Sequence, residues 1–157
     1  MDKNKEPGIS FDNIILKDLV FSRKEGFPMK LEMDVQLGSN ISFSPDGDEL
    51  VYELSCKIKD ENNYFSIKCT MIGFFSVIEG KENMGLKEYS NINAPAAIFP
   101  YIREAIASTT TRAGIPPVVI PPINLRLLKQ NQKNIKKVNQ EKEIQKIEEK
   151  QDAVNEQ

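Results

Sequence analysis

The sequence contains no histidine and only two cysteines among its 157 residues. The absence of histidine removes the usual zinc ligand, the commonest general base, and the Ser-His and Cys-His pairs of nucleophilic catalysis. The chain also lacks a glycine-rich phosphate-binding loop and a titratable cluster of the kind that active sites contain. The composition therefore favours a protein that is not an enzyme, and it predicts neither a bound metal nor a cofactor.

Long apolar runs are also missing. Apolar residues make up 39% of the chain, but polar residues interrupt them well before the ~20 residues that a membrane-spanning helix needs. The first residues, Met1–Pro7, lack the apolar stretch of a secretory signal. We therefore expect a cytoplasmic protein with no membrane insertion.

The formal net charge of −2 is unevenly distributed along the chain. Residues 1–125 hold 17 acidic and 13 basic residues, whereas residues 126–157 hold 6 and 8. An acidic body does not suit nucleic acid, whose phosphates are bound by clustered Lys and Arg side chains. We therefore expect no nucleic-acid partner, and we interpret the mixed charges of the tail as a solvated segment.

The composition divides the chain into three parts. Residues 1–8 are charged and have almost nothing to bury, which predicts a disordered leader. Residues 9–128 carry alternating and then helical apolar patterns, which predict one domain. Residues 129–157 are rich in Gln, Asn, Lys and Glu with a thin apolar stripe, which predicts a charged tail that is partly helical or disordered.

Alternation of apolar and polar residues predicts an antiparallel sheet. The clearest signal runs from Phe27 to Leu37, where every second residue is apolar over eleven residues, so one face is buried and the other solvated. Turns are expected at Pro45–Asp48 and at Asp60–Asn63. The other three strands are expected near residues 9–21, 50–59 and 65–77.

Two details of these strands are predicted from side-chain parity. In the first strand one face is expected to carry Ile9, Phe11, Ile15, Leu19 and Phe21. In the fourth strand, Gly73 suggests a bulge that turns the two following phenylalanines to different faces.

The two cysteines, Cys56 and Cys69, fall on the inward parity of neighbouring strands. A two-residue turn at Asn62-Asn63 would place them directly opposite each other, and a four-residue turn would place them diagonally. Both arrangements leave a disulfide open, whereas the lack of a secretory signal and the usual burial of free cysteine favour two free thiols.

A helix is expected after a polar linker, residues 81–91. Because proline is tolerated only in the first turn, the regular helix is predicted to begin near Pro100, and Gly114 is predicted to end it. Four prolines then predict an extended arm over Ile115–Ile123, and Asn124 begins a C-terminal helix. The predicted fold class is α+β: a four-stranded antiparallel sheet, a long helix packed on it, and a C-terminal helix.

Such a fold has more apolar residues than it can cover. A single-layer α+β unit buries its second face against another copy or leaves it open for a ligand. The sequence therefore predicts a protein that oligomerises and also binds apolar segments. The aromatic residues that carry this prediction are Phe43, Tyr64, Phe74, Phe75 and Tyr101.

Two blocks of the sequence are distinctive: Asn93–Glu104 reads N-A-P-A-A-I-F-P-Y-I-R-E, and Thr111–Pro117 reads T-R-A-G-I-P-P. They resemble the SecB family of protein-export chaperones, whose patterns at these places are N-A-P-x-x-[IL]-F-P-Y-x-R-E and T-x-R-G-x-F-P-P. The resemblance covers about residues 9–128. Shorter matches to the family are Lys17–Phe21, Gly73–Val77 and Pro121–Leu125.

The resemblance implies a long helix that packs dimers into a homotetramer, and a mobile C-terminal helix. It also implies an ATP-independent holdase: a chaperone that binds unfolded precursor polypeptides and passes them to SecA, the motor ATPase of the Sec export pathway.

The resemblance also suggests roles for individual residues, and for each the alternative is a contact within the core of its own subunit. The client-binding groove is expected to be lined by Phe27, Phe43, Phe74, Ile120 and Leu128. The tetramer interface is expected to contain Tyr101, Ile102, Ala105, Ile106 and Thr109.

At the positions where SecA docks in the family, the sequence departs from the family pattern. SecA docks on an acidic sheet face in the family, and Asp18 fits one acidic position, but Ser22 and Lys68 stand at two others. Reversing one charge in such a contact costs several kcal/mol. The alternatives are a SecB-like chaperone devoted to another system, such as an aggregation-prone antitoxin, and a structural oligomer that binds no client.

Overall fold

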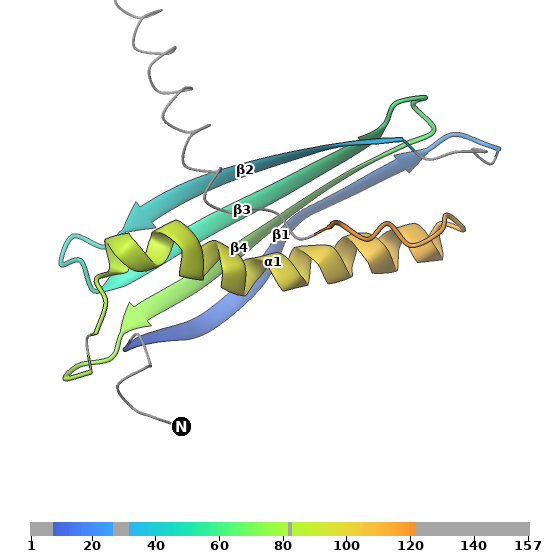
Figure 1. Ribbon diagram of the computed structural model, residues 1–157. Helices are drawn as coiled ribbons and strands as arrows, with labels where there is room; N and C mark the ends of the chain where they lie inside the picture. The colour runs from blue at the N-terminus through green and yellow to red at the C-terminus, as the bar shows by residue number, and fades with distance from the viewer. Residues whose placement is uncertain (1–7, 27–31, 82, 122–157) are drawn as a thin grey trace, which may run out of the picture. The chain divides into compact units, whose positions relative to one another are not determined.

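The computed structural model describes residues 8–26, 32–81 and 83–121, all of which lie within one compact unit. The strands β1 (Ile9–Arg23), β2 (Met33–Phe43), β3 (Glu49–Asp60) and β4 (Phe65–Val77) precede one long helix, α1 (Leu86–Arg112) (Figure 1). The strands form an antiparallel sheet in the order β1-β4-β3-β2. The predicted α+β fold, a four-stranded antiparallel sheet with a long helix on it, is confirmed. The predicted tail, C-terminal helix and most of the leader lie outside the described residues.

The core lies between α1 and the two central strands, β3 and β4 (Figure 1). Because side chains alternate along a strand, every second residue of β3 and β4 faces the helix and is buried. We call this the helix side of the sheet and the opposite face the open side. The side chains with the least exposure on the two layers include Leu54, Cys56, Ile58, Cys69, Ile98, Ile102 and Ile106.

The first strand departs from the predicted parity. Its pairing with β4 shifts between Phe11 and Asn13 and again between Leu16 and Asp18. Each shift inserts one extra residue and exchanges the faces of the residues that follow. Ile15 therefore pairs with Ile72 on the open side, and the prediction that it shares a face with Phe11 is wrong.

The predicted bulge at Gly73 is also wrong. Gly73 pairs with Tyr52 in a register that runs without a shift from Glu49 to Lys59. A Cβ atom at Gly73 would lie 2.8 Å from Cδ1 of Ile98 in α1, so the glycine allows the helix to approach the sheet closely. Phe74 and Phe75 still face opposite sides, because consecutive strand residues do so.

The second strand passes through Gly38 without interruption and continues to Phe43. A Cβ atom at Gly38 would lie 2.8 Å from the Ser55 hydroxyl oxygen, which donates a hydrogen bond to the Gly38 carbonyl at 3.3 Å. The predicted strand over residues 33–37 is confirmed, and its first residues, 27–31, lie outside the described part of the chain.

Both predicted turns are present. Gly47, with φ of 83°, lies in the turn between β2 and β3, where its N–H donates to the Ser44 carbonyl at 3.0 Å. In the hairpin between β3 and β4, Asn63 has φ of 57°, and the Asp60 carboxylate accepts a hydrogen bond from the Tyr64 N–H.

The register of this hairpin places Cys56 directly opposite Cys69, as a two-residue Asn62-Asn63 turn predicts. Both thiols are free and buried, which confirms the favoured interpretation. Burial and the neighbouring Cys69 raise the pKa of Cys56 to about 12, and burial and the charge of Glu104 raise the pKa of Cys69 to about 11.

The helix begins much earlier than predicted. It starts at Leu86, so Pro95 and Pro100 both lie within it and the expected linker is partly helical. A proline inside a helix loses one backbone hydrogen bond and strains the preceding turn. The burial of Ala94 and Ile98 in this stretch, each with 0% exposure, offsets that cost.

The helix ends where the sequence predicts. Gly114 has φ of 71°, and its N–H donates to the Thr111 carbonyl, while the Ile115 N–H donates to that of Thr110. The chain then turns back along α1 (Figure 1), and the Val118 N–H donates to the Thr110 hydroxyl at 3.1 Å. Residues 115–121 contain no helix or strand.

The part of the chain that the structure describes contains no helix long and apolar enough to cross a membrane.

Candidate interaction surfaces

The helix leaves both edge strands partly uncovered on the helix side. α1 packs chiefly on β3 and β4, so apolar side chains of β1 and β2 on the same face remain accessible to solvent. These side chains form two separate rows, one at each edge of the sheet.

The first row, which we call the β2 strip, consists of Met33, Val35, Leu37, Ile41 and Phe43. Met33 and Phe43 are each 39% exposed, and the three residues between them are half-buried. β2 is one of the two edge strands of the described sheet, so one row of its backbone N–H and C=O groups is not used by the sheet. An edge strand beside a row of apolar side chains suits an extended polypeptide, which pairs its backbone with the edge and buries alternate side chains.

The second row, which we call the β1 strip, consists of Ile14, Leu16, Leu19 and Phe21. Leu16 is 50% and Leu19 40% exposed, although both face the helix side. Near one end of the same edge, Phe11 contacts Tyr101 of α1 edge-to-face at 6.1 Å between ring centroids, and Tyr101 is itself 46% exposed. This side of the sheet and helix suits a broad apolar contact, such as one with a second copy.

The residues predicted for the client groove do not lie on one surface. Phe43 ends the β2 strip, whereas Phe74 pairs with Val51 and Asn13 on the open side. Ile120 is 1% exposed and belongs to the core. Phe27 and Leu128 lie outside the described residues.

The residues predicted for the tetramer interface also fall into two groups, one buried and one accessible to solvent. Ile102 and Ile106 have 0% exposure and Ala105 has 9%, so all three are buried within their own subunit. Tyr101 is exposed and Thr109 is half-buried, with its hydroxyl donating to the Ala105 carbonyl at 2.7 Å. Only these two have side-chain surface to offer a second copy.

The sequence interpretation missed Leu16 and Val20, which are 50% and 61% exposed. Val20 lies on the open side and Leu16 on the helix side. The available signal was that the apolar residues of this strand do not all fall on alternate positions. Their faces can be assigned only when the two shifts in the pairing of β1 with β4 are known.

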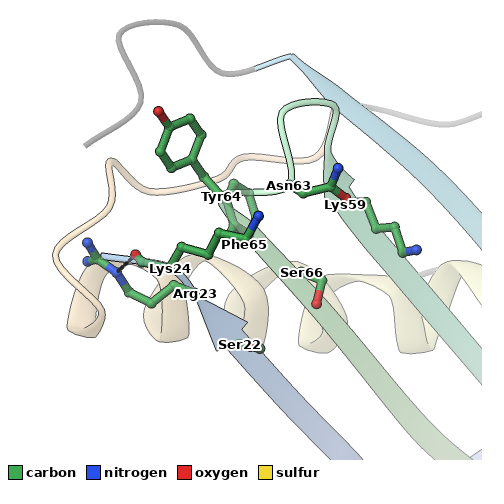
Figure 2. A pocket seen from close by; sticks show the side chains of 8 residues that line it. All are labelled: Ser22, Arg23, Lys24, Lys59, Asn63, Tyr64, Phe65 and Ser66. Carbon is green, nitrogen blue, oxygen red and sulfur yellow. Dashed lines mark hydrogen bonds between the residues drawn. The ribbon is translucent and has the colours of Figure 1, made fainter. Parts of the chain in front are cut away.

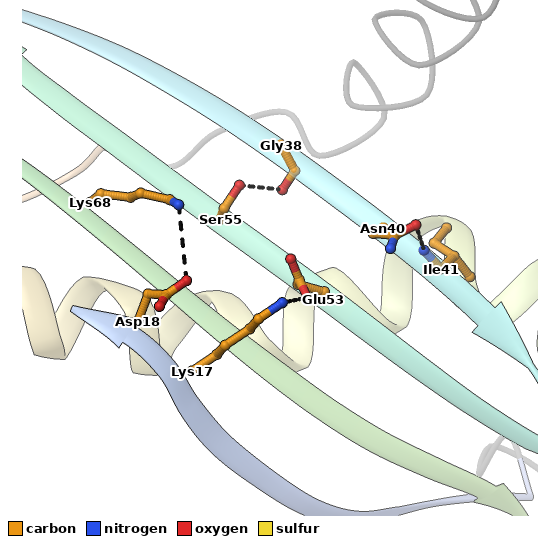
Figure 3. A network of polar contacts seen from close by, with 8 residues as sticks. All are labelled: Lys17, Asp18, Gly38, Asn40, Ile41, Glu53, Ser55 and Lys68. Atoms are coloured by element: carbon orange, nitrogen blue, oxygen red, sulfur yellow. Dashed lines mark hydrogen bonds and ion pairs between the residues drawn. The ribbon is translucent and has the colours of Figure 1, made fainter. Parts of the chain in front are cut away.

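Most charged side chains of the sheet lie on the open side, and four of them are labelled in Figure 3, whereas Asp60 is buried on the helix side and Arg23 pairs there with Phe65. Lys17 donates a hydrogen bond to Glu53 at 2.8 Å, and this hydrogen bond with the Glu53 charge raises the pKa of Lys17. The Asp18 carboxylate lies 3.9 Å from the Lys68 ammonium. Asp18, the residue predicted to dock SecA, therefore lies beside a basic residue.

No group of three or more His, Cys, Asp or Glu side chains in the described ranges is placed to hold a metal ion. Asp46, which lies in the turn after β2, accepts a hydrogen bond from the Ser44 hydroxyl, and this bond lowers its pKa.

Comparisons with known proteins agree with this fold. The family model described as preprotein translocase subunit SecB matches residues 2–136. The protein-export protein SecB of Azoarcus sp. is 29% identical over 145 residues, which cover 87% of this chain and 95% of that protein. The uncharacterized protein MJ0357 of Methanocaldococcus jannaschii is 27% identical over 150 residues, which cover 91% of this chain and 96% of that protein.

A solved structure shares the fold. The Mycobacterium tuberculosis Rv1957 SecB-like chaperone, in complex with a ChAD peptide from the Rv1956 HigA1 antitoxin, has a TM-score of 0.60 and 18% identity. The match covers 73% of this chain and 90% of that one. The chain has the architecture of a SecB-like chaperone. It belongs to the SecB family, and this membership supports a role as a chaperone.

Proposed function

We propose that this protein is an ATP-independent holdase that binds unfolded polypeptides along the β2 strip and keeps them from aggregating. The observation that carries the proposal is a row of exposed apolar side chains on an edge strand, next to a helix that leaves it uncovered. Membership of a chaperone family supports it.

The physical mechanism is burial of apolar surface together with backbone pairing. Each client segment gains roughly 25 cal/mol for each Å² of apolar area removed from water. Hydrogen bonds to the edge of β2 do not depend on the side chains of the client, so binding is tolerant of sequence. Several such sites on one oligomer raise the effective concentration of the next segment, and weak contacts then add up to tight holding.

We also propose that the active form is a homotetramer, built as a dimer of dimers in the cytoplasm. The β1 strip and the exposed Tyr101 supply the apolar surface for contacts between copies. Because these residues lie at the β1 edge, contacts between copies leave the β2 strip at the other edge open to a client.

The holdase has two candidate functions. The first is delivery of the client to the Sec export pathway, and the second is protection of another aggregation-prone protein. The ion pair between Asp18 and Lys68 favours the second, because it neutralises the acid that would meet SecA. The Rv1957 chaperone, which was solved with an antitoxin peptide, offers a precedent for the second.

The test of client holding is suppression of aggregation without nucleotide. We expect the protein to prevent light scattering by a chemically unfolded precursor protein diluted into buffer. The variant Met33→Ser with Phe43→Ser removes two side chains that are each 39% exposed, a loss of about 1–2 kcal/mol of burial. It should therefore need roughly tenfold more protein for the same suppression.

The matched control is Ile15→Ser with Val20→Ser, which removes comparably exposed apolar side chains from the open side. Circular dichroism of both variants checks that the sheet is intact. Equal loss in the two variants would show that the position of the β2 strip is irrelevant, and unchanged aggregation at a molar excess of the wild type would contradict the holdase itself.

The destination of the client is tested separately. Calorimetry with SecA at low salt separates the two candidates, since export requires a measurable heat of binding and a dedicated chaperone does not. Co-purification of bound polypeptides from the native cytoplasm then identifies the clients.

A further inference from the structure

The two cysteines of the chain pair across the central strands of the sheet. Cys56 of β3 lies directly opposite Cys69 of β4, in a register that runs without a shift from Glu49 to Lys59. Both side chains are on the helix side, and both have 0% exposure. The neighbouring pairs on the same side are apolar and buried, and they are Leu54 with Met71 and Ile58 with Ile67. The two thiols therefore lie side by side in the core.

The hydrogen bonding of the sheet indicates the distance between the two Cα atoms. The Val77 N–H donates to the Asp48 carbonyl at 2.9 Å, so it is directed toward the β3 side of β4. Alternate residues of a strand direct their backbone groups to the same neighbour. Because Cys69 lies an even number of residues before Val77, its N–H and C=O groups are directed toward Cys56. The Cα atoms of such a hydrogen-bonded pair are ~5.5 Å apart, within the ~4.4–6.8 Å that a disulfide needs.

The folded structure protects these thiols from oxidants. Burial raises the pKa of Cys56 to about 12 and that of Cys69 to about 11, so little thiolate, the form that attacks an oxidant, is present near neutral pH. A pocket of about 180 Å³ at the hairpin end has Phe65 and Ser66 on its wall (Figure 2), but neither cysteine lines it. We therefore expect an oxidant to reach the pair only after α1 has moved away from the sheet.

We propose that Cys56 and Cys69 form a redox-sensitive latch, which stays open as two thiols in reducing conditions and closes to a disulfide when a small oxidised disulfide is in excess. The closed latch joins the two central strands in the middle of the sheet. It constrains the unfolded chain between residues 56 and 69, and this stabilises the fold. The latch belongs to the core of the subunit, and it does not depend on the proposed holdase function.

Closure is a thiol–disulfide exchange in two steps. One cysteine loses its proton, and its sulfur attacks a sulfur of the oxidant, here oxidised glutathione; a mixed disulfide forms and one glutathione thiolate leaves. The second cysteine loses its proton and attacks the protein sulfur of the mixed disulfide, and the second glutathione thiolate leaves. The two thiolates take up the two protons. Two protein thiols and one oxidised glutathione thus become one protein disulfide and two glutathione thiols.

Folding and closure should favour each other to the same extent, because they are linked equilibria. A disulfide that closes a loop of about 15 residues changes the equilibrium constant of folding by roughly 100-fold. The folded chain should therefore be half-oxidised at a roughly 100-fold lower ratio of oxidised glutathione to the square of reduced glutathione than the chain unfolded in urea. A pair of core thiols that is not placed for a disulfide would show no such difference.

The test is a redox titration of the full-length protein in glutathione buffers, with and without urea, each sample being held until oxidation is complete. Free thiols are then alkylated and counted by intact mass. We expect the oxidised chain to lose both alkylation sites together, with the mass of two hydrogen atoms. The Tm of the oxidised protein should be roughly 6–12 °C above that of the reduced protein. Low urea should speed up oxidation of the folded chain, because it populates the open state.

The matched control variants, Cys56→Ala and Cys69→Ala, each keep one thiol and cannot close the latch. Each should have the same Tm in oxidising and reducing buffer. If the folded wild type needs the same or a higher glutathione ratio for half-oxidation than the chain in urea, the fold opposes the disulfide and the proposal is overturned. A stable mixed disulfide with glutathione in the wild type, or covalent dimers on a non-reducing gel, would overturn it as well.

Discussion

Replacing Leu16 and Leu19 of the β1 strip with serine should dissociate the proposed homotetramer. These side chains are 50% and 40% exposed, which together leaves about nine-tenths of one leucine side chain in water. Fully burying a leucine gains ~1.5–3 kcal/mol, so covering this remainder is worth about 1.4–2.7 kcal/mol for each subunit. In a two-fold symmetric contact both copies contribute, which doubles the effect to about 3–5 kcal/mol. The dissociation constant should therefore rise about 10²- to 10⁴-fold.

Sedimentation velocity over a range of protein concentrations measures this change directly. The control Ile15→Ser with Val20→Ser alters the same strand at side chains that are 43% and 61% exposed, but on the open side. It should sediment like the wild type. If the Leu16 and Leu19 variant also sediments like the wild type, or if the control dissociates to the same extent, the β1 strip is not the contact between copies.

Two further predictions concern the core. Gly73→Ala places a methyl group 2.8 Å from Cδ1 and 2.9 Å from Cγ1 of Ile98. It should therefore lower the free energy of unfolding, measured in urea, by about 1–3 kcal/mol. In an Ile98→Ala background the same change should cost much less, and an equal cost would refute close approach as the reason for the glycine. Burial raises the pKa of Cys56 to about 12 and of Cys69 to about 11, so between pH ~9 and those values the unfolded chain ionises its thiols and the folded chain does not. The free energy of unfolding should then be highest below pH ~8.5 and fall with rising pH by at most ~1.4 kcal/mol per pH unit for each thiol; a Cys56→Ala and Cys69→Ala variant with the same alkaline slope would refute this.

The positions of the strands follow from the sequence because their helix-side residues are buried by one layer of structure. In β3, Leu50, Leu54 and Ile58 have exposed fractions of 0–1%. Buried and more accessible residues alternate along this strand, as apolar and polar residues do in its sequence. The bulges of β1 do not follow from it. The inserted residues, Asp12 and Lys17, are ordinary polar residues with no local signal for a bulge, and only pairing with β4 reveals them.

The beginning of α1 shows the limit of a local rule. Pro95 and Pro100 are unfavourable inside an isolated helix, and on that basis the helix was expected to begin near the second of them. In the folded chain, Ile98 and Ile102 are fully buried on the sheet, and this tertiary contact outweighs the local penalty. Periodicity also placed Ile102 and Ile106 correctly on one helix face, but it could not distinguish their own sheet from a second copy as the surface that covers them.

Surplus apolar surface follows from the ratio of one helix to four strands. Adjacent strands lie ~4.8 Å apart, so four strands present a face about 19 Å wide, whereas a helix with its side chains is ~10–12 Å across. A helix centred on β3 and β4 must therefore leave β1 and β2 partly bare, as Leu16 and Phe43 show. Filling that width within one chain would take a second helix against the sheet. In the described part of the chain the two bare edges face outward on opposite sides of α1, and each can take a different occupant: a second copy at β1, and an unfolded polypeptide at β2. The proposed capacity to hold clients then follows from a sheet that is wider than the helix that covers it.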